Sequence, residues 1–453
     1  MAGTGLSPQI RILAGGEPRL LVGIGELDAG SLAGYRAAGG YAGLTRAIEK
    51  LSPEEVISEI AAAGLRGRGG AGFPTSEKWR VARDTVADRK IVVANLIATD
   101  PSSLGDRTLA EGNPHLVLEG LLIAAFATGA SEAIIAVRRD WTLAIERLRA
   151  AVEQATEARL AGYLVLGTDV SVQVTVWEGS GALVAGEETA LLHALQGDRG
   201  MPFIRPPYPA ERGLWGVPTV VQNAETLAHA AWILAHSAHA FASVGTEKSK
   251  GTKLVTLFGK LPEGGVLEVP LGMPLRDVLR EAGGGTGITK ALFVGGPGGG
   301  AIDAAGLDLP YDYESLEAAG AVIGSGSILV TDDTTCMVDT ARFFLDFSAR
   351  EACGKAVPCR IGTLRLVETI DRILAGTPRP DDLVALRELT RKIVDTALCK
   401  LEALAPGPML TTLDRFEDEY RAHAERGICL AGACETAGML PLLTPLADGG
   451  SVG

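Results

Sequence analysis

The sequence lacks the features of several protein classes. Basic residues are the minority, 42 against 55 acidic ones, and the formal net charge is −13. A nucleic-acid-binding protein normally has a basic face, so this charge balance disfavours that class. No basic amphipathic stretch for a membrane surface stands out either. The longest apolar stretch, residues 116–128, contains Glu119 and is too short to span a lipid bilayer.

A secretion signal is also missing, because the first eight residues contain no basic start followed by an apolar run. We therefore expect a cytoplasmic protein that would reach a membrane complex only peripherally, through partner proteins. Cysteine is scarce, and in a long chain without a secretion signal we expect reduced thiols or metal ligands rather than disulfides. The six cysteines are Cys336, Cys353, Cys359, Cys399, Cys429 and Cys434.

Apolar residues and glycine are plentiful. Hydrophobic residues make up 47% of the chain and charged residues 21%, which is enough for a large core and argues against disorder. Many of the 58 glycines lie in short clusters. Clustered glycine indicates tight turns or a close approach of the backbone to a ligand.

Five segments are predicted along the chain. Residues 1–35 form a loose N-terminal arm, because they show no hydrophobic period. Residues 36–245 form an α/β domain with a largely parallel sheet, since short apolar strands alternate there with helical patterns. Residues 246–335 form a small β-grasp module, residues 336–440 a helical bundle, and residues 441–453 a tail.

The element predictions follow from periodicity and from turn residues. A capping box that starts at Ser52 predicts a helix ending at Gly64. Further helices are predicted at residues 114–128, 142–160 and 275–282. Strands are predicted at residues 90–94, 133–137, 171–176, 253–258, 266–269 and 327–331.

The sharpest local feature is the glycine-rich segment at residues 64–75. Five of its first nine residues are glycine, so several main-chain N–H groups can turn towards one anion. Arg66, Arg68 and the nearby Lys78 add positive charge. These features predict a phosphate-binding loop. Taken alone, the glycine spacing is equally consistent with a flexible hinge.

This segment resembles the signature of the flavoprotein subunit of respiratory complex I. The same signature occurs in its relatives, the diaphorase subunits of NAD-linked hydrogenases and formate dehydrogenases. Residues 186–192, 205–209 and 213–227 resemble further segments of that family, and the resemblance covers about residues 35–440. It implies a Rossmann-like FMN and NADH domain, a β-grasp module of the soluble-ligand-binding type and a C-terminal helical iron–sulfur domain.

The resemblance also implies the site residues. In that family the glycine-rich loop holds the FMN phosphate and the start of the bound NADH. Phe73 is then a stacking surface for adenine. Glu187 and Glu188 match a second flavin segment and are the expected catalytic residues, the alternative being a solvated acidic turn. The expected cofactor-binding residues are Gly67, Arg68, Gly69, Gly70, Phe73, Lys78, Asn95, Asp100, Gly186, Glu187, Glu188, Gln222 and Asn223.

Residues 95–102 depart from the family pattern, which reads Asn-Ala-Asp-Glu-Ser-Glu-Pro-Gly. Ile97 and Ala98 replace two acidic residues, and Gln222 stands where the family prefers Asn. Asp100 replaces a glutamate that resembles a ribose-hydroxyl acceptor, and its charge would favour NAD over NADP by repelling a 2′-phosphate. Each lost acceptor in a nucleotide site can cost about 1–3 kcal/mol.

The iron–sulfur motif is incomplete. The family binds a [4Fe–4S] cluster through Cys-x-x-Cys-x-x-Cys and a distant fourth cysteine, and four thiolates are the usual complement. Cys353, Cys359 and Cys399 match three of these positions, so they are the expected metal ligands. Ala356 occupies the middle position and cannot coordinate iron.

Three outcomes follow for the cluster. A four-iron cluster can persist with water or another group at one iron, a three-iron cluster can form, or the cysteines can be structural residues without a cluster. Cys429 and Cys434 do not have the spacing of a recognisable metal site. Cys336 is expected to be a packed thiol.

Three functions stay open. The first is an FMN-dependent electron-transfer subunit, an oxidoreductase of the NADH dehydrogenase or diaphorase type that passes electrons from NAD(P)H through FMN to iron–sulfur partners. The resemblance implies a thioredoxin-like [2Fe–2S] subunit and a larger iron–sulfur subunit as those partners. The second function is a non-catalytic scaffold paralogue, and the third is a flavoprotein that takes its electrons from another donor. The retained flavin segments favour the first.

Overall fold

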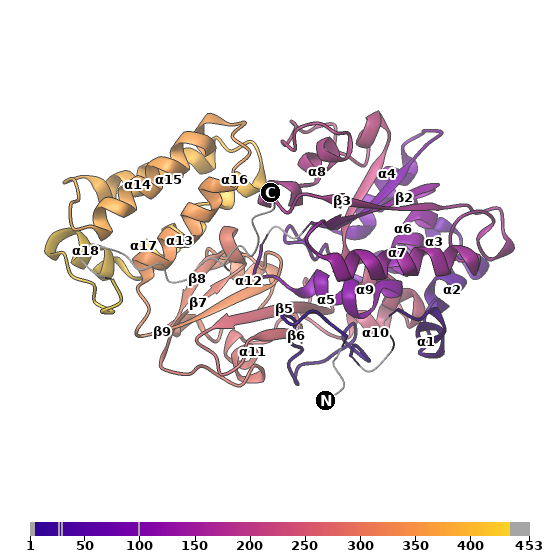
Figure 1. Cartoon of the computed structure of the whole chain (residues 1–453), viewed down its shortest axis with the longest axis horizontal. Coiled ribbons are helices and arrows are strands. Elements are labelled where there is room, and N and C mark those ends of the chain that lie inside the picture. The colour runs from indigo at the N-terminus through magenta and orange to yellow at the C-terminus, as the bar shows by residue number, and fades with distance from the viewer. Residues whose placement is uncertain (1–4, 26–27, 29, 98–99, 435–453) are drawn as a thin grey trace, which may run out of the picture.

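The computed structural model describes residues 5–25, 28, 30–97 and 100–434. A helix-covered parallel sheet forms one end of the molecule, and the C-terminal helices form the other (Figure 1). A second, mixed sheet lies against both. The chain therefore has the α/β architecture that the alternation of strands and helices predicts.

Four parallel strands form the first sheet. They are β1 (Ile91–Leu96), β2 (Glu132–Arg138), β3 (Gln173–Gly179) and β4 (Thr219–Asn223), in the order β3-β2-β1-β4. β1, β2 and β4 are largely buried, which explains their continuous apolar runs. β3 lies at the edge and is half exposed, which explains its alternating pattern. Sequence analysis predicted the first three strands and did not identify β4 as a strand.

The order of the strands creates a switch point beside β1. The chain runs from β1 outwards through β2 and β3, and then returns to add β4 on the opposite side of β1. The register places Asn95 at the end of β1 next to Asn223 at the end of β4. In open parallel sheets, ligands bind outside the carboxyl ends of the strands where the strand order reverses. The fold therefore directs attention to the ends of β1 and β4.

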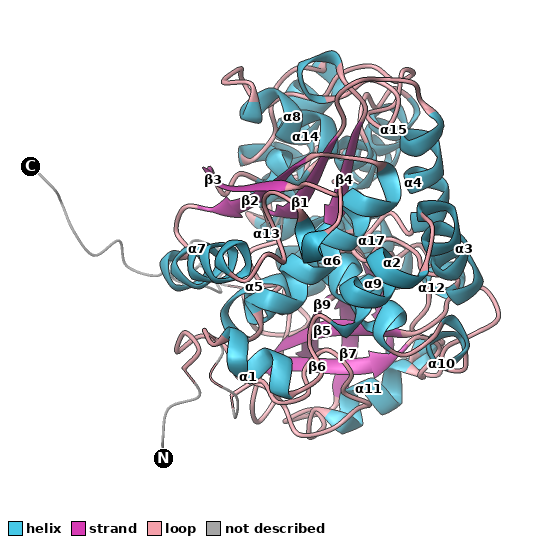
Figure 2. Ribbon diagram, turned by 90° about the vertical axis from the view of Figure 1, so that its right-hand side faces the viewer, coloured by secondary structure: helices cyan, strands magenta, loops and turns pink. Residues whose placement is uncertain are grey.

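Helix α6 (Pro114–Thr128) is buried over almost its whole surface, in agreement with its apolar composition. Its bounds match the prediction, because Pro114 occupies the first turn and Gly129 takes a left-handed conformation at the end. Helices α5, α6 and α9 lie between the two sheets (Figure 2). Besides α6, the helices of this domain are α1 (Leu32–Ala37), α2 (Ala42–Lys50), α3 (Pro53–Ala63), α4 (Thr75–Asp84), α5 (Gly105–Gly112), α7 (Thr142–Glu157), α8 (Glu188–Leu195), α9 (Ala224–Ala235) and α10 (Ala238–Ala242).

The second sheet has five strands in the order β6-β5-β9-β7-β8. Its first two strands form an antiparallel hairpin, and the last strand, β9, returns parallel to β5. Helix α11 packs its apolar face on this sheet. The strand–turn–strand–helix–strand order is the one predicted, with β7 and β8 as additions. The elements are β5 (Thr252–Gly259), β6 (Gly265–Pro270), α11 (Leu275–Glu281), β7 (Thr289–Val294), β8 (Gly300–Asp303), α12 (Tyr313–Ala318) and β9 (Ser327–Asp332).

The C-terminal part is helical, as predicted. Its helices enclose their own apolar core, and α17 also packs against β8 of the second sheet. Among the described residues, no helix has both the length and the apolar character needed to cross a lipid bilayer. The helices are α13 (Met337–Arg350), α14 (Thr363–Leu374), α15 (Asp382–Asp395), α16 (Lys400–Leu404), α17 (Gly407–Arg415) and α18 (Glu417–Arg426).

The prediction of a loose N-terminal arm is wrong for residues 5–25. The buried carboxylate of Glu268 accepts hydrogen bonds from the backbone N–H groups of Arg19, Leu20 and Leu21 at 2.7, 2.8 and 3.2 Å. Leu20 is itself buried in the core of the α/β domain. A segment without a hydrophobic period can still be ordered when a distant carboxylate satisfies its backbone, and periodicity cannot report such a contact.

Candidate functional site

The glycine-rich segment is a tight loop between α3 and α4. The N–H of Gly67 donates to the carbonyl of Phe73 at 2.9 Å, which closes the loop on itself. Gly70 has a φ of 118°, and a Cβ there would lie 3.2 Å from the backbone of Gly324. Only glycine fits this position at low cost, because other residues would be strained in both conformation and space. The loop is therefore held in shape and is not a flexible hinge.

Arg68 corrects one prediction. Its side chain is only 1% exposed, so the guanidinium does not face a ligand. It donates instead to the carbonyls of Arg66, Lys250 and Thr252 at 3.1, 2.6 and 3.1 Å. Its backbone N–H donates to the hydroxyl of Thr226 at 2.8 Å. Arg68 supports the loop from the protein interior, and the positive charge for a phosphate must come from elsewhere.

Arg66 is also engaged by the protein. Its Nε donates to the carbonyl of Gly72 at 2.7 Å, and its guanidinium pairs with Glu314 of α12. The same guanidinium lies over the ring of Tyr313, 4.1 Å from the ring centre. Arg66 thus ties the loop to the second sheet's domain.

Lys78 is the cation that contacts the predicted second flavin segment, residues 186–192. Its Nζ donates to Glu188 Oε2 at 2.8 Å and to the carbonyl of Val221 at 3.2 Å. Glu188 also accepts from Arg205 at 3.1 Å. Burial acts to raise the pKa of Glu188, but the attraction and hydrogen bonds of Lys78 and Arg205 outweigh it and lower that pKa. Glu188 is thus an ionised carboxylate held between two cations.

Glu187 begins helix α8. Its carboxylate accepts from the N–H groups of Thr189 and Ala190, both at 2.9 Å, and so caps the helix. Its other oxygen lies 3.7 Å from Arg205. Glu187 is buried and the side chain of Glu188 is only 18% exposed, so the alternative of a solvated acidic turn does not hold.

Two asparagines, Asn95 and Asn223, lie at the ends of β1 and β4 and contact the other predicted site residues. The amide of Asn95 donates to the carbonyl of Gly186 at 3.2 Å, which fixes the start of the acidic segment against β1. Asn223 caps α9, and a Cβ added to Gly69 would lie 3.2 Å from it. Gln222, next to Asn223, is buried in β4. The structure therefore gathers these predicted residues at the switch point of the sheet.

A buried group of charged residues supports these site residues, and the sequence analysis did not identify it. Asn223 donates to Asp106 at 2.6 Å, and Lys253 donates to Glu225 at 2.6 Å. Burial, with a further contribution from Glu225, raises the pKa of Asp106 to about 7, while burial lowers the pKa of His229 to about 4. These residues lie far apart in the sequence and form no motif, so nothing in the sequence connects them.

Asp100 corrects a second prediction. It is 3% exposed and accepts from the backbone and the hydroxyl of Ser102 at 2.9 and 2.5 Å, and from the hydroxyl of Ser327 in β9. Burial raises its pKa, although the serine hydrogen bonds act to lower it. Its carboxylate is hydrogen-bonded within the protein and is not exposed to accept from ribose hydroxyls. The charge of Asp100 therefore gives no reason to expect NAD over NADP. Ile97 is buried, and Ala98 lies outside the described residues.

The surroundings of the loop fit a phosphate and a nucleotide base. The hydroxyl of Thr75, the first residue of α4, is buried and has no hydrogen-bond partner among the described residues. An unpaired buried hydroxyl at a helix N-terminus is suited to an anion. Phe73 is 50% exposed, so its ring is available for stacking.

The three predicted cluster cysteines lie near one another and near the acidic pair. The carbonyl of Cys353 accepts from Arg199, just beyond α8, at 2.8 Å. Burial chiefly raises the pKa of Cys359 to about 12, with smaller contributions that include Cys399 and Cys353. Burial also raises the pKa of Cys399, and the charge of Glu187 adds to the effect. Arg199 and Glu187 thus connect the region of α8 with Cys353 and Cys399.

This cysteine set does not fit a [4Fe–4S] cluster with four protein thiolates. Ala356 brings no ligand, and the cysteines supply three thiols where the cluster usually takes four. The remaining cysteines lie in the described part of the chain and, like these three, are free thiols.

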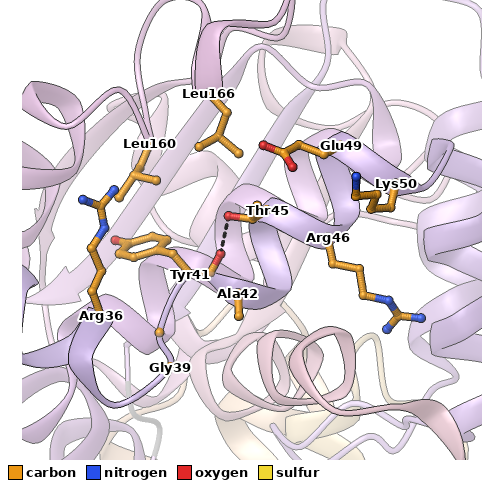
Figure 3. A pocket seen from close by; sticks show the side chains of 11 residues that line it. Arg36, Gly39, Tyr41, Ala42, Thr45, Arg46, Glu49, Lys50, Leu160 and Leu166 are labelled. Carbon is orange, nitrogen blue, oxygen red and sulfur yellow. Dashed lines mark hydrogen bonds between the residues drawn. The ribbon is translucent and has the colours of Figure 1, made fainter.

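The protein also has a surface pocket of about 480 Å³, formed largely by α2 and its surroundings (Figure 3). Arg36, Arg46, Glu49 and Lys50 give it a charged rim, and Thr45 donates to the carbonyl of Tyr41 at 2.8 Å inside it. None of the residues predicted from the sequence lines this pocket. We therefore place the functional site at the glycine-rich loop, where the chemistry converges.

Two family models match the chain. One is described as the Nuo51 FMN-binding domain and matches residues 60–232, which contain the glycine-rich loop and the acidic pair. The other is described as the NADH-ubiquinone oxidoreductase-F iron-sulfur binding region and matches residues 339–423, which contain Cys353, Cys359 and Cys399.

Similar proteins match over nearly the whole chain. The NADP-reducing hydrogenase subunit HndC of Solidesulfovibrio fructosivorans is 43% identical over 413 residues, covering 90% of this chain and 84% of that subunit. The second F-type subunit of the NADH-quinone oxidoreductase of Rhizobium meliloti (strain 1021) is 36% identical, covering 91% and 99%. The crystal structure of an NAD⁺-reducing [NiFe]-hydrogenase in the H₂-reduced state matches with a TM-score of 0.82 and 30% identity, covering 93% of this chain and 69% of that one.

Proposed function

This chain belongs to the family of flavoproteins that includes the F-type subunits of NADH-quinone oxidoreductase, and from that premise we propose that it is an FMN-dependent electron-transfer subunit of a multisubunit oxidoreductase. Electrons pass from NAD(P)H through FMN to iron–sulfur partners. The observation that carries the proposal is the convergence of the glycine-rich loop, Lys78 and Glu188 at the ends of β1 and β4.

The residues of this chain would bind and orient the cofactor. The loop around Gly69 and Gly70, the start of α4 and the Thr75 hydroxyl would hold the phosphate, and Lys78 would supply the charge. Asn95 lies at the end of β1, and Lys78 connects Glu188 to Val221 of β4. When bound, FMN supplies the conversion of a two-electron hydride into single electrons. Glu188 stays ionised because Lys78 and Arg205 pair with it.

The iron–sulfur motif, through which electrons would leave FMN, distinguishes this chain from the family pattern. Cys353, Cys359 and Cys399 provide three thiols, and Ala356 removes the fourth ligand, so no step through a resident [4Fe–4S] cluster follows from these residues. We propose that the acceptors are a thioredoxin-like [2Fe–2S] subunit and a larger iron–sulfur subunit of the complex, and that the complex is cytoplasmic or attached to a membrane through other subunits.

The test is an anaerobic purification with the natural partners, followed by an ultraviolet–visible spectrum and by additions of NADH and NADPH. We expect flavin bands that bleach within the mixing time with one of the two nucleotides. A flavin that dithionite reduces but neither nucleotide reduces would point to another donor. A colourless protein without flavin or iron would contradict the proposal and support a scaffold.

A further inference from the structure

Four potential metal ligands meet in the C-terminal domain, and none of them belongs to the set of Cys353, Cys359 and Cys399. Cys336 precedes α13, His423 lies in the last turn of α18, and Cys429 and Cys434 follow α18. Their ligand atoms all lie within 4.8 Å of one another, and Cys336 Sγ is 3.4 Å from His423 Nε2. Sequence spacing alone did not suggest a site here, because Cys336 and His423 are 87 residues apart.

These separations fit one metal ion. A tetrahedral zinc ion, with Zn–S distances of about 2.3 Å and Zn–N distances of about 2.0–2.1 Å, keeps its ligand atoms roughly 3.5–3.8 Å apart. The measured distance from Cys336 to His423 is close to that range. An iron–sulfur cube would bind each ligand to a different iron and hold the ligands farther apart. A disulfide would use only two of the three thiols and would leave His423 without a role.

The local structure holds the ligands in position. Gly427 and Gly432 have φ values of 63° and 65°, which turn the chain after α18 back towards α13. Cys429 and Cys434 pack against the apolar core of the domain, while Cys336 and His423 are buried. Such surroundings exclude water and are typical of a closed, structural site.

A second set of contacts joins the same two helices. Glu419 of α18 accepts from the N–H of Met337 at 3.0 Å and pairs with Lys290 of β7 at 2.6 Å. The start of α13 and the body of α18 are thus already fixed relative to each other. The ligands on these helices, Cys336 and His423, are preorganised, and only the segment after α18 has to be captured.

We propose that Cys336, His423, Cys429 and Cys434 bind one zinc ion that fastens the segment after α18 to the start of α13. Three thiolates and one neutral imidazole form a Cys₃His site, and the three thiol protons are released on binding. The site does not use the iron–sulfur cysteines Cys353, Cys359 and Cys399: Cys336, Cys429 and Cys434 lie outside the matched residues 339–423, and His423 is the last residue of that match. Its role is structural, since four protein ligands leave no open position for a substrate.

The first experiment measures metal in the full-length chain purified without chelators. We expect about one zinc per chain, and an X-ray absorption spectrum with three sulfur and one nitrogen ligand. Cobalt substitution should give the intense visible bands of a tetrahedral thiolate site. These measurements on the unchanged chain need no variant, so they do not depend on how substitutions fold. Absence of zinc, a disulfide between two of these cysteines, or iron bound by them would overturn the proposal.

The second experiment compares the two cysteine sets. His423→Ala and Cys434→Ser should each lower the affinity for zinc, measured by competition with a chelator, by about tenfold or more, because even the loss of a supporting residue behind a ligand costs 10–100-fold in affinity. Cys399→Ala, in the other cysteine set, is the matched control and should keep its zinc. Zinc that survives in both ligand variants but leaves the Cys399→Ala variant would show that the ion is bound by the other set.

Discussion

The entry side and the exit side of the electron path differ in how completely they are built. On the entry side, the glycine-rich loop, Lys78 and the acidic pair are present, and each is held by a hydrogen bond or a helix cap. On the exit side, Cys353, Cys359 and Cys399 lie together but lack a fourth ligand. Both regions match one family pattern, and the departures on the entry side, at residues 95–102, leave the glycine-rich loop and the acidic pair in place. We therefore expect flavin binding and cluster binding to be separable.

The reason for this independence is the placement of the two sets of residues. The flavin residues stand on the parallel sheet and on the helices that begin at its edge. The cysteines belong to the C-terminal helical domain, which has its own apolar core: Cys353 and Cys399 lie outside its helices, and Cys359 lies in the short π-helix Pro358–Gly362. A substitution such as the one that placed Ala356 in the motif therefore leaves the loop intact. The predictions below change one side at a time.

The largest effect is expected at Gly70. Gly70→Val should reduce the flavin content of the purified chain by about tenfold or more, because strain at such a φ costs about 1–3 kcal/mol and Gly324 leaves no room for a side chain. Flavin released by acid precipitation, per protein, is the measurement.

The control for this variant is Gly283→Ala. Gly283 also has a positive φ, of 89°, but nothing lies within 4 Å of its missing Cβ. It should lose some stability and keep its flavin. If both variants lost flavin equally, general destabilisation rather than the shape of the loop would be responsible.

The next largest effect is the gain of an iron–sulfur cluster at Cys353, Cys359 and Cys399. Ala356→Cys restores the fourth thiol, so anaerobic reconstitution should give about four iron atoms and a reducible [4Fe–4S] signal by electron paramagnetic resonance. Val357→Cys adds a thiol to the neighbouring, exposed position and should give no such signal. A cluster in both variants would mean that Cys353, Cys359 and Cys399 suffice without a thiol at position 356. A cluster in neither would mean that the three cysteines do not share a cluster site.

A moderate effect is expected at Lys78. Lys78→Met should cost about 1–3 kcal/mol in the free energy of unfolding at neutral pH, because Glu188 loses a charged hydrogen-bond partner. The folded-state pKa of Glu188 is lowered, so its stabilising effect is present above the unfolded pKa of about 4.3 and is lost as the pH falls through the folded pKa. The difference between variant and wild type, measured by urea unfolding, should therefore shrink in acid.

The surface pair of Arg11 and Glu263 is the matched control for Lys78. Both side chains are more than half exposed although the atoms are 2.6 Å apart. Arg11→Met should change the free energy of unfolding by no more than about 0.5 kcal/mol. An equal loss in both variants would mean that Lys78 forms only an ordinary surface ion pair.

Local signals in the sequence predicted much of this molecule. The helix at residues 114–128 was predicted with its observed bounds, because Pro114 and Gly129 mark its two ends. The loop around Gly70 was identified because phosphate binding requires glycine at close spacing. What the sequence did not predict depends on contacts between distant segments. Strand β4 is short and was not recognised, and it is its pairing with β1 that makes it a strand.

The side chains whose roles were predicted wrongly or not at all also depend on contacts between distant segments. Arg68 carries a charge in a glycine-rich loop, which is typical of a phosphate ligand, yet its partners are carbonyls as far away in the sequence as Thr252. His423 is an unremarkable helix residue until folding brings Cys336 next to it. Periodicity and motif spacing describe the neighbourhood along the chain, so they cannot decide which way a charged or ligating side chain turns in the folded protein.

The smallest effect is expected at Asp100, and it tests the corrected role of that residue. Asp100→Asn should leave the apparent affinity for NADH and NADPH unchanged, because the carboxylate is already used by Ser102 and Ser327. If Asp100 accepted a hydrogen bond from a ribose hydroxyl, the substitution would instead cost about 1–3 kcal/mol of nucleotide-binding free energy. The folded-state pKa of Asp100 is raised by burial, so wild-type stability should decrease as the pH rises from the unfolded pKa of about 3.9 to the folded pKa. The variant should lack that slope in urea unfolding across this range. A weakened affinity for NADH with unchanged stability would return Asp100 to the nucleotide site, and would mean that the segment after β1 changes its contacts when the nucleotide binds.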